Sequence, residues 1–149
     1  MGYIEELRAI AGHRPLILVA GVILVFDEHQ RLLLIQRADD GQWALTGGLM
    51  EPGETTEQTA RREVFEEAGL EVGEIEFLGV FSGPELFHIY PNGDEVFGVS
   101  VAYTARYPGS PLKLDPAEAL QAQFFALDAL PANLRKSTPI YLERYRARG

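Results

Sequence analysis

The stretch from Gly48 to Leu70 reads GLMEPGETTEQTARREVFEEAGL and has the pattern of a glycine-containing loop followed by a helix. The helix is expected to begin at Thr55 or Thr56, because a threonine side chain accepts hydrogen bonds from the free backbone N–H groups of a first turn. It is expected to end at Gly69, since glycine readily adopts the conformation that closes a helix. The stretch therefore predicts one loop–helix unit.

The predicted helix carries an apolar face and, beside it, a cluster of three glutamates. The apolar residues recur at every fourth position and can pack on a sheet: Ala60, Val64 and Ala68. Glu63, Glu66 and Glu67 lie side by side, where like charges repel by roughly a few tenths of a kcal/mol per pair. A hard divalent cation would neutralise them, and oxygen-only ligands favour Mg²⁺, Mn²⁺ or Ca²⁺ over Zn²⁺.

The loop before the helix offers further groups for such a site. Gly47, Gly48 and Gly53 permit close approaches that a Cβ atom would prevent, so a carbonyl freed there can bind a metal. Glu54 lies just before the helix start, where the helix dipole favours a carboxylate. From the residues alone, a role for Glu54 in the site and an ordinary capping role carry equal weight.

Length and composition place the chain among globular proteins. Its 149 residues correspond to one domain, residues 1–149, and the hydrophobic fraction of 46% excludes disordered and fibrous classes. The absence of cysteine excludes a disulfide framework, a thiolate zinc site and a cysteine nucleophile. The N-terminus has no basic segment before an apolar stretch, so we expect a cytoplasmic protein. The apolar run Leu16–Phe26 is too short to span a bilayer, so no membrane partner is expected.

The charge of the chain is strongly negative and unevenly distributed. A net charge of −9 argues against binding to nucleic-acid polymers, which requires a basic surface. Nine glutamates and only two arginines lie between Glu51 and Glu76. A solvated helix face explains most runs of this kind, but the spacing of Glu63, Glu66 and Glu67 favours a metal site. A calcium-binding acidic module is a weaker alternative, because no Asp-rich calcium loop is present.

Strands and a few helices in irregular order make up the rest of the chain. The expected elements are helices Tyr3–Ala11 and Ser137–Arg148, a helical turn Asp128–Leu130, and strands Leu16–Phe26, Arg31–Arg37, Trp43–Leu45, Glu71–Phe81, Leu86–Tyr90, Glu95–Tyr107 and Phe124–Ala126. The first two strands look like a hairpin, and Pro91–Asp94 is expected to be a turn. This order indicates an α+β fold with a mixed sheet packed by helices, and it disfavours a doubly wound βαβ array.

The loop–helix stretch also resembles a known family motif. Gly48, five residues, Glu54, seven residues, and then the run from Arg62 to Leu70 match all nine fixed positions of the Nudix box. This box is typical of the Nudix hydrolase family, which includes MutT-like proteins. It covers residues 48–70, and the resemblance extends to the flanks without identifying a subfamily.

The resemblance implies a fold, a reaction and a cofactor. The fold is an α/β/α sandwich with a mixed sheet, in which the box forms a loop-helix-loop. The reaction is a pyrophosphohydrolysis, in which water attacks a phosphorus of a nucleoside diphosphate linked to another group, X, with Mg²⁺ or Mn²⁺ as cofactor. The implied metal ligands are the Gly48 carbonyl, Glu63, Glu66 and Glu67. Glu54 and Arg62 would support catalysis beside Glu66 and Glu67.

Residues outside the box are candidates for binding this substrate. Arg37 could donate two hydrogen bonds to a phosphate, or it could be a surface arginine. Glu85, Phe87 and Tyr90 lie around the later hairpin, where aromatic rings could stack on a base or belong to the core. Trp43 could line a base pocket, but burial in the core is the better interpretation.

The resemblance leaves the general base, the identity of X, the number of metals and the assembly open. Glu118 lies just before the last strand, whereas Gln121 stands where many family members carry a glutamate, so a base outside the box is not identified. A non-catalytic domain that senses a nucleotide is an alternative, which the complete set of box acids argues against. The apolar faces of both terminal helices either pack on the chain's own sheet or, as we predict, belong to a homodimer in which a terminal helix or the Leu86–Phe97 hairpin contacts the partner.

Overall fold

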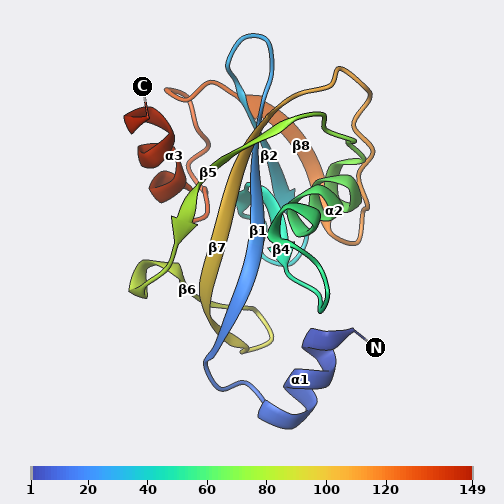
Figure 1. Cartoon of the computed structure of the whole chain (residues 1–149), viewed down its shortest axis with the longest axis vertical. Coiled ribbons are helices and arrows are strands. Elements are labelled where there is room, and N and C mark those ends of the chain that lie inside the picture. Colours follow the sequence, from blue (N-terminus) through green and yellow to red (C-terminus); the bar gives the residue numbers. More distant parts are fainter. Residues whose placement is uncertain (1, 149) are drawn as a thin grey trace.

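The computed structural model describes residues 2–148, in which eight strands form one mixed sheet with helices around it (Figure 1). The helices are α1 Tyr3–Ala11, α2 Thr56–Ala68 and α3 Thr138–Ala147, with a short 3-10 turn, η1, at Pro84–Leu86. The strands are β1 Leu16–Phe26, β2 Leu32–Arg37, β3 Trp43–Ala44, β4 Thr46–Leu49, β5 Ile75–Phe81, β6 Phe87–Ile89, β7 Glu95–Arg106 and β8 Ala119–Phe125. The sheet order is β3-β2-β1-β7-β5, while β4 pairs with β1, β6 with β7 and β8 with β2. The predicted α+β class with a mixed sheet is confirmed.

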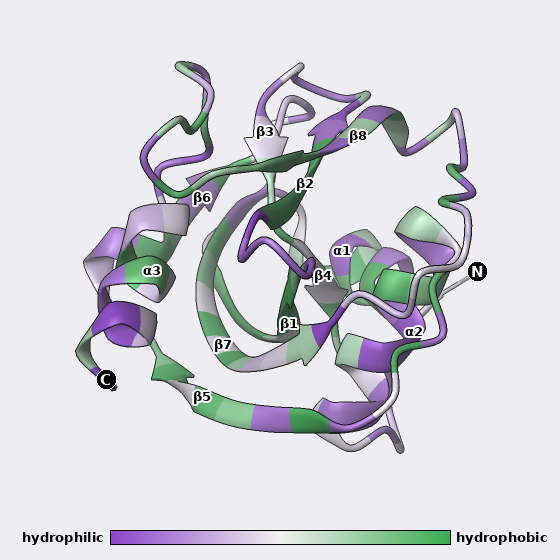
Figure 2. Ribbon diagram, turned by 90° about the horizontal axis from the view of Figure 1, so that it is seen from above, coloured by the Kyte–Doolittle hydropathy of each residue, from purple (hydrophilic) through white to green (hydrophobic). Residues whose placement is uncertain are grey.

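The central strand β1 is apolar because both faces of its second half are covered, and Figure 2 shows its ribbon in mostly hydrophobic colours. It pairs in parallel with β7, from Leu16↔Val96 to Phe26↔Arg106. It meets β2 only at Phe26↔Leu32, so the predicted hairpin is joined at its tip alone. The reason is that β4 pairs antiparallel with residues 20–23 of β1.

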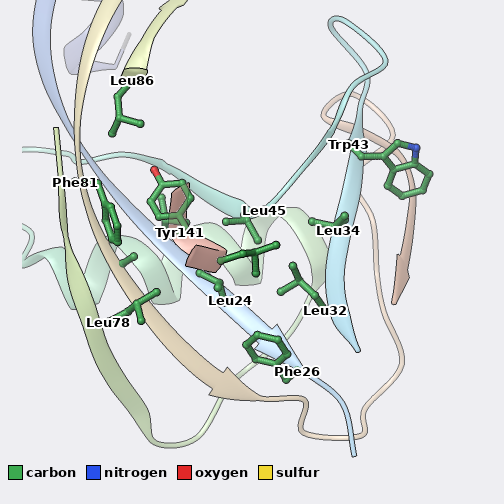
Figure 3. Close-up of a cluster of buried hydrophobic side chains, with 13 residues drawn as sticks. Leu24, Phe26, Leu32, Leu34, Trp43, Leu45, Leu78, Phe81, Leu86 and Tyr141 are labelled. Atoms are coloured by element: carbon green, nitrogen blue, oxygen red, sulfur yellow. The ribbon is translucent and has the colours of Figure 1, made fainter. Parts of the chain in front are cut away.

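Alternate residues of β1 face two different core clusters, as expected for the period of a strand. On one side they pack with α3, in a cluster that includes Leu24, Phe26, Tyr141 and Leu142 (Figure 3). On the other side they pack with α2, in a cluster that includes Ile23, Val25, Ala60 and Val64. The sheet therefore lies between α2 and α3, which confirms the predicted sandwich.

Helix α2 begins and ends where the sequence predicts. The Thr55 hydroxyl accepts the Gln58 N–H, and the Gln58 side chain accepts the Thr55 N–H, which forms a capping box. Gly69 closes the helix in the left-handed conformation, at φ 70°. The helix packs so closely on β1 that a Cβ atom at Gly21 would lie 2.8 Å from the backbone of Thr56. Gly21 therefore sets the distance of the helix, and with it the position of the box glutamates.

Strand β5 starts later than expected. It was predicted to begin at Glu71, but it begins at Ile75, which pairs with Ala105. Its partner β7 ends at Arg106, so residues 71–74 have no strand to pair with. The start of β5 is thus determined by its neighbour and not by its own residues.

The C-terminal part of the sheet also differs from the prediction. The last strand covers Ala119–Phe125 and not Phe124–Ala126, because it pairs along the whole of β2. Residues 128–130 form no helix in the structure; a single turn is closed by the Ala129 N–H and the Ala126 carbonyl. Polar residues on the exposed face of β8 concealed its length in the sequence.

Helix α1 lies apart from the sheet in Figure 1 and is attached mainly by polar contacts. None of its residues is fully buried. Arg8 donates to the Glu95 carbonyl at 2.7 Å and lies 3.5 Å from Asp94, which joins the helix to β7 and the turn before it. Within residues 2–148, the helices are too short or too polar to cross a bilayer.

Candidate active site

Two of the box glutamates, Glu63 and Glu67 in the second half of α2, line a cleft of about 490 Å³ together with β4 and the β6 region. The predicted site residues that line it are Arg37, Gly48, Glu63, Glu67, Glu85, Phe87 and Tyr90. Three other predicted site residues are not part of its lining: Glu54, Arg62 and Glu66. The structure thus divides the predicted set into residues that contact the cleft and residues that lie behind it.

Glu67 is the most deeply buried carboxylate of the box, with 3% of its surface exposed. Burial raises its pKa to about 8, although the Gly47 N–H donates to it at 2.7 Å and lowers the pKa. Burial also raises the pKa of Glu63, against the opposing effect of Arg62. Two neighbouring carboxylates that are costly to ionise would be stabilised by a cation in the cleft.

The glycine backbone of β4 lies against Glu63. A Cβ atom at Gly48 would lie 2.4 Å from the carboxyl carbon of Glu63, so no other residue fits there without moving the side chain. At Gly47, a Cβ atom would lie 2.7 Å from the Gly21 carbonyl. The two glycines therefore let main-chain atoms and carboxylate oxygens meet at one edge of the cleft.

Arg62 lies behind the cleft and connects the acidic residues. Its guanidinium donates to both oxygens of Glu54, at 2.6 and 3.0 Å, and to the Leu49 carbonyl at 3.0 Å. It also donates to Glu63 at 2.9 Å and to Glu66 at 3.2 Å. These contacts fix the direction of the glutamates, so Arg62 is a positioning residue.

Glu54 serves as the counter-ion of Arg62. Hydrogen bonds from Arg62 lower its pKa to about 2, which outweighs the effect of burial. The Glu51 N–H and the Thr59 hydroxyl also donate to it, at 2.9 and 3.0 Å. Thr59 is fully buried. Its role was not predicted from the sequence, although its position on the first turn of α2, beside the loop, could have indicated a contact with Glu54.

Three box carboxylates, those of Glu54, Glu63 and Glu66, are paired with Arg62, whereas Glu67 is not. Glu66 is half exposed and contacts Arg62 at 3.2 Å. In residues 2–148, no three acidic or histidine side chains are grouped closely enough to hold an ion between them. The chemistry of the buried oxygen donors nevertheless fits a hard divalent cation, because Glu63 and Glu67 have too few donors of their own to offset their burial.

Glu118 joins this acidic end of the cleft. It lies in the cleft lining, and its charge adds to the effect of burial in raising the pKa of both Glu63 and Glu67. Gln121 is not part of the lining; its amide donates to Gln36 on β2 at 2.7 Å. The acid beside the last strand is therefore Glu118, whose contact with the cleft depends on the pairing of β8 with β2.

Arg37 and aromatic residues of the β6 region also line the cleft, and Arg37 lies near enough to Glu67 for their charges to interact. Arg37 donates to both oxygens of Asp39 at 3.0 Å, and within residues 2–148 its second terminal nitrogen has no hydrogen-bond acceptor. Tyr90 meets His88 edge to face, with ring centroids 4.5 Å apart. Trp43 is buried against Phe125 in the core, as expected.

Known proteins similar to this chain share the domain that contains this cleft. Residues 15–145 match the family model described as NUDIX domain. A MutT-like protein of Streptomyces ambofaciens is 36% identical over 120 residues, which cover 76% of this chain and 74% of that protein. The ADP-ribose pyrophosphatase of Methanocaldococcus jannaschii is 35% identical over 120 residues, covering 78% of this chain and 65% of that protein.

Solved structures agree with this assignment. The crystal structure of a MutT NUDIX hydrolase from Burkholderia pseudomallei superposes with a TM-score of 0.73 at 28% identity, covering 87% of this chain and 98% of that one. The chain spans less than half the length of another relative, the NAD-capped RNA hydrolase NudC of Vibrio atlanticus, at 41%. The family match extends over most of the chain and includes the box, so the chain belongs to the Nudix hydrolase family, with MutT-like homologues.

Proposed function

We propose that this Nudix hydrolase is a divalent-metal-dependent pyrophosphohydrolase that cleaves a nucleoside diphosphate linked to a group X. The observation that carries the proposal is the pair of carboxylates formed by buried Glu67 and partly buried Glu63, beside the Gly48 backbone in an open cleft. Such a pair is stable when ionised only if a cation joins it. A diphosphate substrate has the same requirement, since its adjacent negative charges repel an attacking water.

The residues that would hold Mg²⁺ or Mn²⁺ are the Gly48 carbonyl, Glu63, Glu66, Glu67 and Glu118. When bound, the metal supplies positive charge to the phosphate oxygens and lowers the pKa of water. Arg62 holds Glu63 and Glu66 at fixed positions, and Glu54 holds Arg62. In the reaction, the water oxygen forms a bond to one phosphorus and loses a proton to solvent, while the anhydride P–O bond breaks and the bridging oxygen leaves with the other phosphorus, giving a nucleoside monophosphate and phosphorylated X.

Arg37 and the aromatic residues of the β6 region would hold the rest of the substrate. Arg37 has a free terminal nitrogen that can donate to a phosphate oxygen. Phe87 and Tyr90 offer ring faces for a base or sugar, and Glu85 offers acceptors for hydroxyl groups. The names of two relatives, ADP-ribose pyrophosphatase and NAD-capped RNA hydrolase, indicate substrates that contain a diphosphate bond. The group X differs between these two substrates.

A non-catalytic nucleotide-sensing domain is the second candidate. Such a domain needs the cleft but not the buried acids, whose ionisation in the absence of a ligand is costly. Glu63, Glu66 and Glu67 are all present; Arg62, paired with Glu54, holds the first two, and the Gly47 N–H holds Glu67, which favours catalysis.

The test is a hydrolysis assay with Mg²⁺ and a panel of diphosphate substrates, followed by a chelator. Glu66→Gln and Glu67→Gln are each expected to lower kcat by at least about a hundredfold, because each removes a charge from the metal site. Glu74→Gln, an exposed glutamate outside the box, is the matched control and should retain full activity. Undiminished turnover in excess chelator would contradict the metal mechanism.

A further inference from the structure

The wall of the cleft that is formed by β6 and by the loop before α3 contains polar nitrogens without partners among residues 2–148. Among the buried side-chain nitrogen and oxygen atoms of residues 2–148, three have no hydrogen-bond partner: Arg8 Nε, His88 Nε2 and Arg135 Nε. Two of the three, on His88 and Arg135, belong to residues that line this cleft. Leaving a buried polar group without a hydrogen-bond partner is destabilising, so a pair of them on one wall calls for a functional explanation.

Arg135 is held firmly at this place by the loop before β3. Its N–H donates to the Trp43 carbonyl at 2.7 Å, and the neighbouring Asn133 amide donates to the Gly41 carbonyl at 2.8 Å. Its guanidinium contacts Asp40 at 3.0 Å through one terminal nitrogen only. Within residues 2–148, no carboxylate pairs with the other guanidinium nitrogens, and the direction of the side chain is fixed.

The wall separates the cleft from a second hollow on its outer side. This hollow, of about 530 Å³, shares four lining residues with the cleft: Phe87, His88, Arg135 and Lys136. The partition is therefore one layer of side chains thick, and it contains both nitrogens that lack partners.

The free polar atoms on this wall are mainly donors. Asp39 and Asp40 already accept hydrogen bonds from Arg37 and Arg135. Lys136 is exposed and has no ion pair within 4 Å among residues 2–148, so it adds an uncompensated positive charge. Arginine and lysine donate and cannot accept, so these two side chains can bind an oxyanion with donors alone, whereas a neutral sugar would also need the acceptors of Glu85 elsewhere in the lining.

His88 is suited to the same ligand in its uncharged form. Burial lowers the pKa of its imidazole, and the nearby charge of Arg135 lowers it further. The ring is held edge to face against Tyr90, with centroids 4.5 Å apart. A neutral ring can present an N–H at Nε2 while Arg135 and Lys136 provide the charge.

We propose that His88, Arg135 and Lys136 form a distal subsite that binds an oxyanion, a phosphate or a carboxylate, carried by the X group of the substrate. The proposal rests on the proposed function, because it assumes that the diphosphate lies at the acidic end of the cleft. It narrows the substrate class from any nucleoside diphosphate derivative to those in which X is itself an acid.

The experiment compares substrates that differ only in this charge. UDP-glucose and UDP-glucuronate share base and diphosphate and differ by one carboxylate on X; ADP-ribose and its derivative phosphorylated on the terminal ribose form the equivalent phosphate pair. With Mg²⁺, the charged member of at least one pair is expected to have a kcat/KM about tenfold higher, the effect of a charge-assisted hydrogen bond. The pair that shows the preference identifies the oxyanion as carboxylate or phosphate.

Variants connect the preference to the wall. Arg135→Gln and the exposed Lys136→Gln should each reduce the ratio between charged and neutral substrates towards one, and Lys136→Gln carries little risk of misfolding. Arg106→Gln, an exposed arginine at the far end of β7, is the matched control and should keep the wild-type ratio. A wild-type ratio of one or less in both pairs, or a ratio unchanged in both test variants, would overturn the subsite.

Failure of the proposed function gives a different result. If no diphosphate in the panel is hydrolysed, the subsite is judged by calorimetric titration of glucose phosphate and glucose bisphosphate in Mg²⁺. Tighter binding of the bisphosphate that is lost in Arg135→Gln and kept in Arg106→Gln supports the oxyanion subsite without any turnover. Equal affinities for the two sugars, or a preference that Arg135→Gln leaves intact, would overturn it.

Discussion

The Thr59 hydroxyl affects the cleft indirectly, through a chain of hydrogen bonds. It donates to Glu54, which holds Arg62, which in turn contacts Glu63 and Glu66. Thr59→Val keeps the shape of the side chain and removes this donor. A hydrogen bond to a charged group contributes roughly 1.5–3 kcal/mol, so we expect kcat to fall by about tenfold while KM for the nucleotide changes little.

The conservative variant separates positioning from simple packing. Thr59→Ser retains the hydroxyl and should recover most of kcat, although it loses a buried methyl group and some thermal stability. Steady-state kinetics and a thermal melt of both variants measure the two effects independently. If Thr59→Val kept the wild-type kcat, the contact with Glu54 would have no part in positioning the site.

The turn between β1 and β2 depends on one buried acid. Asp27 accepts the N–H groups of His29 and Arg31 and the side chain of Arg31, at 2.7–3.0 Å. Burial alone would raise its pKa, but the hydrogen bonds from Arg31 prevail and lower it below the usual 3.8. The ionised form therefore stabilises the fold at pH values above the unfolded pKa, and this contribution is lost as the pH falls through the lower, folded pKa.

Asp27→Asn tests this turn. We expect it to lower the free energy of unfolding at pH 7 by roughly 1–3 kcal/mol, because the amide loses the charge and one acceptor. Urea denaturation at pH 7 and at pH 3 should show a difference between wild type and variant that shrinks in acid. A difference that stayed constant across this range would show that the charge of Asp27 is unimportant.

Elements with local signals were predictable from the sequence, and elements determined by a partner strand were not. The boundaries of α2 follow from Thr55 and Gly69, which act on neighbouring backbone groups. The start of β5 and the length of β8 depend on where β7 and β2 end, which no nearby residue records. Pairing between distant strands overrode local preference in both cases.

The same distinction holds for the site. Glu63 and Glu67 were predicted from helical spacing and lie in the cleft. Glu118, His88 and Arg135 reach that cleft through strand pairing and loop contacts far from the box, so their spacing in the sequence carries no comparable signal. The acidic end was therefore visible in the sequence, whereas the wall formed by β6 and the loop before α3 required the fold.

Assembly into a homodimer remains a prediction, and exposed apolar residues of the whole molecule support it. Phe77 and Val80 on the edge strand β5, and Ile17 and Phe97 on β1 and β7, are exposed. We expect light scattering at micromolar concentration to give about twice the chain mass of 16.5 kDa. A measured mass near that of a single chain, together with full activity, would contradict the dimer and leave the hydrolase assignment unaffected.

The parallel pairing of β1 with β7 has a consequence for biosynthesis. Leu16 pairs with Val96 and Phe26 with Arg106, so the most apolar strand is made long before its longest partner. At roughly 5–20 residues per second, the nascent chain waits several seconds between the two strands. During that time the run of leucine, isoleucine and valine in β1 is unpaired along one edge and open to aggregation. The pairing of β1 with β7 can be completed only after Arg106 has left the ribosome. We therefore infer that the sheet folds late and cooperatively, and that contacts between residues distant in the sequence dominate its folding.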